Sequence, residues 1–278
     1  ITSNLLKNPV KTNASPKQLI LGLMLAGKGR QVKAAHIVLA CSLFGVSENS
    51  ARVAMARLVA EGQLKSAGRG IYTLGKQAAF TGQDIQGWNN RLTATCAWNG
   101  NFYAVFTAHL GRSNRKQLQL REKALALLGF REFEQGLFLR PANLNLGLAG
   151  IQEKLLAQGV EKTVLAFEMK PASPAQTSLI QKLWDIRKLE KLYLSHTKKL
   201  NDWMQGYSRM KLEKAARDAY LVGSQAIYEV RRDPLLPAEW INAAARQQFF
   251  ESVLRFDETG TRVWRELQLR ILKDEEVI

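Results

Sequence analysis

The sequence predicts an α+β protein of several domains: a helical segment with a β-hairpin, a segment of alternating strands and helices, and a helical segment. Its 278 residues exceed what one compact core usually holds. Polar or proline-rich breaks at residues 81–87 and 170–174 disfavour helix and separate the segments. We therefore expect a flexible arm at residues 1–16 and domains at residues 17–80, 90–170 and 175–278.

The first segment predicts three helices followed by a hairpin, the order of a winged helix-turn-helix. Ser47 can cap the third helix, and Gly62 can end it. The turn Gly68-Arg69-Gly70 joins two short strands and carries Arg69 at its tip, which is a hairpin signal. The predicted elements are helices at 17–25, 33–44 and 47–61 and strands at 63–67 and 71–74.

The middle segment predicts strands that alternate with helices. An amphipathic helix ends at Gly129, and a tight turn at Gln135-Gly136 joins two strands. The predicted elements are strands at 102–106, 130–133, 137–140 and 162–167 and helices at 114–128 and 146–157. Their order, β-α-β-β-α-β, predicts a ferredoxin-like central domain.

The last segment predicts a helical C-terminal domain. Its predicted helices cover residues 177–200, 211–228, 237–255 and 259–272. Between the second and third helices lies a run from Arg231 to Pro237 that contains two prolines, so a rigid connector is expected there.

The charge of the chain favours an anionic partner. The formal net charge is +16, and it falls along the chain, from +8 over residues 1–90 to +5 over 91–175 and +3 over 176–278. Such a field favours polyanions, of which nucleic acid comes first and an anionic membrane or a phosphorylated metabolite second.

Other classes of protein are disfavoured by composition. The longest apolar stretches, at 19–26 and 36–46, are shorter than the roughly 20 residues that span a bilayer, and no signal peptide is apparent. Cys41 and Cys96 lie in apolar settings, so we expect both to be buried thiols in a reducing cytoplasm. The scattered histidines match no metal-site spacing, so no metal or cofactor is expected.

The third predicted helix has the pattern of a recognition helix, which enters the major groove of DNA. Ala51, Ala54, Met55, Leu58 and Val59 recur at helical spacing and form an inner face. Asn49 and Arg52 lie in the first turns of the outer face, where Arg suits guanine and Asn suits adenine. Serines at the helix start suit phosphate, and the wing suits the backbone or the minor groove. The predicted DNA-binding residues are Ser47, Asn49, Ser50, Arg52, Arg57, Lys65 and Arg69.

Five stretches carry a family resemblance. They are FGVSENSARVAMARLVAEG at 44–62, LLGF at 127–130, GLFLRP at 136–141, LWD at 183–185 and RDPLLP at 232–237. In this order they resemble the PaaX family, repressors of bacterial phenylacetic acid catabolism, over about residues 17–250. Two departures are that Asn49 stands where the family often has Arg, and that a further Pro and Gly are missing after Pro237.

The resemblance implies an N-terminal winged helix, a central Cas2-like domain and a helical C-terminal domain. It also implies a homodimer that represses a phenylacetate-type operon and leaves double-stranded operator DNA on binding an aryl-CoA thioester, typically phenylacetyl-CoA. Such an effector needs cations for its phosphates and an aromatic pocket, for which Trp184, Arg231 and Arg232 are candidates. Aromatic side chains at helical spacing are more often core than ligand pocket, and the lysines at 188, 191, 198 and 199 are explained as a solvated helix face.

Three alternatives stay open. The helices and hairpin could mediate protein contact alone. A metal-dependent nuclease needs carboxylates at the end of the first central strand, yet Asp is absent between Asp84 and Asp185. An RNA-binding sheet needs exposed aromatics, for which Phe102, Tyr103 and Phe106 are the candidates.

Overall fold

The computed structural model describes residues 15–26, 31–76, 78 and 87–275. Over these residues it is an α+β structure with small antiparallel sheets and a helical C-terminal region. The chain forms two compact units, the first from residues 1–89, 196–229 and 251–278 and the second from residues 90–195 and 230–250. Each unit therefore joins segments that are far apart in sequence. Whether residues 17–80, 90–170 and 175–278 fold as separate domains stays a prediction.

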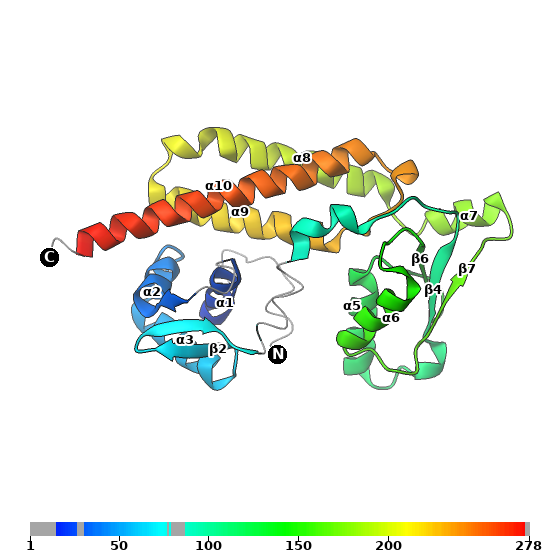
Figure 1. Cartoon of the computed structure of the whole chain (residues 1–278), viewed down its shortest axis with the longest axis horizontal. Helices are drawn as coiled ribbons and strands as arrows, with labels where there is room; N and C mark the ends of the chain where they lie inside the picture. The colour runs from blue at the N-terminus through cyan, green and yellow to red at the C-terminus, as the bar shows by residue number, and fades with distance from the viewer. Residues whose placement is uncertain (1–14, 27–30, 77, 79–86, 276–278) are drawn as a thin grey trace. The chain divides into compact units, whose positions relative to one another are not determined.

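The N-terminal part of the first unit contains helices and a small sheet (Figure 1). The elements are α1 (Pro16–Ala26), β1 (Val32–Lys33), α2 (Ala34–Ser42), α3 (Glu48–Ala60), β2 (Leu64–Gly68) and β3 (Ile71–Leu74). The strand order is β1-β3-β2, and Leu64 lies opposite Leu74. Strand β1, in which Val32 pairs with Tyr72, was not predicted, because two residues are too few to show a periodicity.

The ends of α3 are set by local signals. The Ser47 hydroxyl accepts a hydrogen bond from the Ser50 backbone N–H at 3.3 Å, which satisfies one of the free donors at the helix start. Gly62 follows the helix with a φ of +66°. A Cβ on Gly75 would lie 2.1 Å from the Gly62 carbonyl oxygen, so the end of the hairpin passes too close to α3 for any other residue.

One hydrophobic core serves both the N-terminal and the C-terminal parts of the first unit. Leu19, Met55 and Leu58 are among its buried residues, and Tyr220 of α9 (Leu212–Arg232) belongs to the same cluster. The Phe44 ring meets the Tyr220 ring edge-on, with centroids 5.4 Å apart. The N-terminal helices are therefore packed against the C-terminal helices.

The long C-terminal helices are α8 (Ile186–Gly206), α9 and α10 (Ala243–Glu275). In the first unit, Phe256 of α10 contacts the Trp203 ring of α8, with centroids 4.6 Å apart. A Cβ on Gly223 of α9 would lie 3.2 Å from the same phenylalanine ring. Aromatic packing thus joins the three helices. No described helix combines the length and the apolar character needed to cross a membrane.

Two predicted helix boundaries in this region were wrong. The helix predicted at 177–200 is divided into α7 (Pro174–Gln181) and α8, because Trp184 turns into the core and Asp185 starts a new helix by accepting from the Lys188 N–H at 2.9 Å. The helices predicted at 237–255 and 259–272 are one helix, α10. This helix begins at Ala243, and Phe256 within it packs on the Trp203 ring of α8.

The second unit contains a four-stranded antiparallel sheet. Its elements are β4 (Phe102–Phe106), α5 (Arg115–Leu127), β5 (Arg131–Glu134), β6 (Leu137–Pro141), α6 (Gly147–Ala157) and β7 (Leu165–Met169). The strand order is β5-β6-β4-β7, and β7 begins three residues later than predicted. Figure 1 shows α5 and α6 on the same side of the sheet, where Leu125 and Ile151 pack on Val105 in one core cluster.

Short 3₁₀ turns occur in both units, at Gly87–Asn90, Leu92–Ala94, Ala108–Leu110, Tyr207–Arg209 and Ala238–Trp240.

Residues 233–237 of the RDPLLP connector are buried in the second unit. Asp233 is 2% exposed, and its carboxylate accepts from the Tyr193 hydroxyl at 2.6 Å and from the Leu235 N–H at 2.7 Å. Leu235 has a φ of +51°, which is strained for a residue other than Gly. The connector passes so close to Gly129 that a Cβ on this residue would lie 2.7 Å from the Pro234 carbonyl oxygen.

A buried arginine supports this connector from the sheet. Arg140 of β6 is 1% exposed and donates to the carbonyl oxygens of Pro141 and Leu128 and, at 3.0 Å, to Oδ1 of Asn143. The Asn143 amide in turn donates to the Leu235 carbonyl at 2.8 Å. Burial lowers the pKa of Arg140 to about 9, so its guanidinium is still charged at neutral pH.

Candidate nucleic-acid interface

The outer face of α3 is open to solvent. Ala51, Ala54, Met55 and Leu58 are buried, as predicted. The opposite side of the helix exposes Asn49, Val53, Ala56 and Ala60, with Arg52 and Arg57 along its two borders. Val59, which was predicted to be buried, is instead 36% exposed, because it lies at the edge of the apolar face. A ridge of small side chains bordered by arginines can therefore approach another surface closely.

The start of α3 presents hydroxyl groups. Ser47 and Ser50 are both exposed, and the Ser47 hydroxyl donates to the Ser50 hydroxyl at 2.9 Å. The first backbone N–H groups and the helix dipole make this end positive, which suits a phosphate oxygen. Asn49 is exposed in the same turn. The structure thus brings these three predicted residues together.

Arg52 and Arg57 differ in their surroundings. The Arg52 guanidinium donates to Oε1 of Glu48 from Nε at 2.8 Å, and Nη2 lies 2.7 Å from the same oxygen. Arg57 is exposed in the last turn of the helix. Glu48 was not among the predicted residues; its i,i+4 spacing to an arginine is visible in the sequence, but the same spacing occurs on many solvated helices.

The hairpin carries the other predicted cations. Lys65 of β2 and Arg69 at the turn are exposed, and the register places Lys65 opposite Thr73. The turn is shaped by Gly68 and Gly70, which have φ values of +153° and +68°. The Ser66 hydroxyl donates to the Gly68 carbonyl at 3.1 Å. The hairpin therefore offers two exposed cations, one on its first strand and one at its turn.

A buried contact lies behind this surface. Tyr220 is 7% exposed, and burial raises its pKa, with Cys41 as a second cause. Burial also raises the pKa of Cys41 to about 11, so this thiol stays protonated. Cys41 is buried as predicted, but Cys96 is exposed, because it lies in a loop and outside any helix or strand.

The predicted effector-binding residues lie in the second unit. Trp184 is 5% exposed, its indole N–H donates to the Gly129 carbonyl at 3.2 Å, and its ring lies 5.9 Å from that of Trp240. These contacts explain the buried position of the Trp184 side chain without a bound ligand. Arg232 is exposed and Arg231 half-buried at the end of α9. The role of all three in effector binding stays a prediction.

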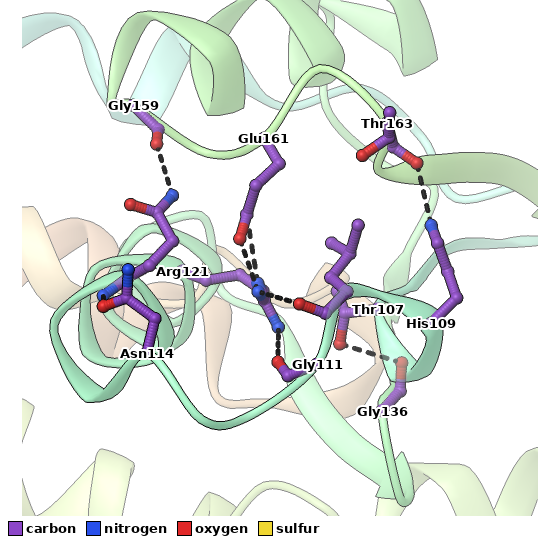
Figure 2. Close-up of polar contacts among 11 residues, drawn as sticks. Thr107, His109, Gly111, Asn114, Arg121, Gly136, Gly159, Glu161 and Thr163 are labelled. Carbon is purple, nitrogen blue, oxygen red and sulfur yellow. Dashed lines mark hydrogen bonds and ion pairs between the residues drawn. The ribbon is translucent and has the colours of Figure 1, made fainter.

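The end of β4, where a nuclease would carry a carboxylate, holds a different set of side chains (Figure 2). Arg121 of α5 is 3% exposed, and its Nη2 lies 2.5 Å from Oε1 of Glu161. It also donates to the Gly111 carbonyl at 3.3 Å, while His109 Nε2 lies 2.9 Å from the Thr163 carbonyl. The cluster thus fastens the loop after β4 to the loop before β7. In the described part of the chain, no three His, Cys, Asp or Glu side chains are grouped to hold a metal ion.

The aromatic side chains of β4 are not arranged for base stacking. Phe102 is 0% exposed and Tyr103 is 8% exposed. Phe106 is half-buried and stacks on the ring of His109, with centroids 5.7 Å apart. The exposed platform that single-strand binding requires is therefore not formed by these three residues.

Comparison with known proteins finds a family model that is similar to the N-terminal region. Residues 16–78 match the model of the family described as PaaX-like protein. An uncharacterized protein from Mycobacterium tuberculosis has a similar solved structure, with a TM-score of 0.59 and 20% sequence identity over 90% of this chain and 98% of that one. This likeness concerns the fold. A comparison with curated proteins found no match.

Proposed function

Because residues 16–78 match the model of the PaaX-like family, we propose that the chain is a DNA-binding transcriptional regulator. The observation that carries the proposal is the open outer face of α3. Its buried side is apolar, and its free side offers Asn49, Arg52 and Arg57. Over the residues that the structure describes, this face is exposed and carries polar donors.

The N-terminal part is proposed to act as a winged helix-turn-helix. In this arrangement α3 enters the major groove, which is about 12 Å wide and admits one helix. Asn49 and Arg52 then face base edges, while Ser47 and Ser50 hold phosphate. The hairpin, as the wing, places Lys65 and Arg69 on the backbone or in the minor groove. The formal charge of +8 over residues 1–90 supports an anionic partner for this region.

The regulator is proposed to be a cytoplasmic homodimer that represses an aromatic-acid catabolic operon and is released by an aryl-CoA effector. These finer points rest on the resemblance of the whole chain to the PaaX family. A dimer would place two copies of α3 on half-sites about 34 Å apart, or a multiple of that distance. Sedimentation of the complex measures the stoichiometry, and one monomer per operator would refute the dimer.

The DNA-binding proposal is tested with the full chain and a random duplex library. We expect selection of a preferred duplex and a binding constant that falls steeply with salt, because cations on the protein displace counterions. RNA of equal length is the control and should compete less well than duplex DNA. Equal competition by RNA, or no enriched duplex, would refute the proposal.

The effector proposal has its own test, because a ligand that binds the folded state raises the melting temperature. CoA thioesters of aromatic acids are compared with the corresponding free acids and with CoA alone. We expect a shift with the thioester only, together with loss of bound duplex. A shift of equal size with CoA alone would refute an aryl-specific effector.

A further inference from the structure

We propose that Glu48 is a positioning residue for base recognition, which holds the Arg52 guanidinium by one edge and presents its other edge to a guanine. The inference rests on the proposed function, because it requires α3 to lie in the major groove. The inference goes beyond the proposed function by assigning a role to an acidic residue on a surface that otherwise meets phosphate.

The geometry supports this role. Glu48 is the first residue of α3, and Arg52 follows one turn later. A single carboxylate oxygen, Oε1, lies 2.8 Å from Nε and 2.7 Å from Nη2 of Arg52. A guanidinium has two such edges, one formed by Nε and Nη2 and one by Nη1 and Nη2. Among the described residues, the ion pair uses the first edge, so the second edge is left to bind O6 and N7 of guanine together.

The charges of the pair lead to a distinctive expectation. A lone carboxylate at this place would be repelled by the phosphates of DNA, whereas a carboxylate paired with Arg52 is neutralised. The pair as a whole adds no net charge to the surface. Arg52 should therefore contribute to the choice of base and little to the general attraction, in contrast to Arg57, Lys65 and Arg69.

A purely structural role has to be distinguished, because an i,i+4 ion pair also stabilises its own helix. The chain offers a matched control. Lys198 and Asp202 of α8 form an ion pair with the same spacing, at 2.6 Å, and with side chains 76% and 59% exposed. The Glu48 and Arg52 side chains are 62% and 57% exposed. Removing either carboxylate should change the melting temperature to a similar, small extent.

The experiment compares full-length wild-type protein with E48A, E48Q, R52A, E48A/R52A and D202N. The preferred duplex is first selected from a random library. The Kd is then measured for that duplex, for each of its single-base variants and for an unrelated duplex, at several salt concentrations.

We expect E48A to lose about tenfold discrimination at one base pair. The base pair affected should be the one at which R52A abolishes discrimination. The double variant E48A/R52A should lose no more discrimination than R52A alone. The affinity of E48A for the unrelated duplex should stay equal or rise, and its salt slope should steepen. E48Q keeps an acceptor oxygen and should retain most of the discrimination, while D202N should match wild type in every duplex.

Two results would overturn the inference. If E48A bound every duplex more tightly by one common factor, Glu48 would only repel DNA. If E48A weakened all duplexes alike and D202N did the same, the ion pair would be merely structural. A wild-type chain that binds no duplex refutes the proposed function itself, and the inference with it.

Discussion

Replacing Arg140 with methionine should destabilise the protein strongly, because three buried oxygen atoms depend on its guanidinium. Nε donates to the Pro141 carbonyl and Nη2 to Asn143 Oδ1, each at 3.0 Å, and Nη1 donates to the Leu128 carbonyl. Methionine fills most of the same volume and donates nothing. Each buried acceptor left without a donor costs about 1–3 kcal/mol.

The net effect is smaller than the sum over three acceptors. Arg140 is a buried cation that donates to neutral oxygens, so removing it also removes the cost of burying its charge. We therefore expect the free energy of unfolding to fall by about 3–5 kcal/mol. Arg115, which is exposed on α5, is the matched control. Its replacement with methionine should stay within about 0.5 kcal/mol of wild type.

Urea unfolding followed by tryptophan fluorescence measures this effect, since Trp98, Trp184 and Trp240 lie in the same unit as Arg140. Arg140→Lys separates charge from geometry, because lysine keeps the charge and loses the planar fork. The reasoning would be refuted if Arg140→Met unfolded within about 1 kcal/mol of wild type. Full rescue by lysine would show that charge, and not the three directed hydrogen bonds, is what matters.

Three further predictions follow. Arg69→Ala should weaken binding to all duplexes alike and flatten the salt slope, since its role is with phosphate; a loss confined to one base pair would contradict it. Gly75→Ala should lower the free energy of unfolding by about 1–3 kcal/mol, because the new Cβ meets the Gly62 carbonyl, whereas Gly206→Ala has open space and should be near neutral. The hydrogen bond from Arg121 lowers the pKa of Glu161, so its stabilisation is present above the ordinary carboxyl pKa and is lost as the pH falls through the lowered one. Urea unfolding should therefore show the difference in stability between wild type and Glu161→Gln shrinking as the pH falls below the ordinary carboxyl pKa, and a constant difference would contradict this.

Local signals in the sequence predicted the N-terminal region well. The helix expected at 47–61 is observed as Glu48–Ala60, because a capping serine and a following glycine act within a few residues. The hairpin was found for the same reason, since its turn requires Gly68 and Gly70. The exposed donors of α3 follow from helical periodicity once the apolar face is known.

Tertiary packing decided the features that were predicted wrongly or missed. The break between α7 and α8 depends on Trp184, whose indole reaches the Gly129 carbonyl from a distant part of the chain. The continuity of α10 depends on Phe256 and Gly260 packing against other helices. The partnership of Glu48 with Arg52 is local, but its pattern is shared by many solvated helices, so spacing alone could not single it out.

The core shared by Phe44 and Tyr220 has a consequence for biosynthesis. The N-terminal helices leave the ribosome well before Tyr220 and the partly buried Leu221 and Trp264, which complete their core. A nascent protein therefore carries an uncovered apolar surface around Phe44 until α9 and α10 have been synthesised, and surfaces of this kind bind chaperones or aggregate. Full assembly of this core has to wait until Trp264 of α10 has been translated.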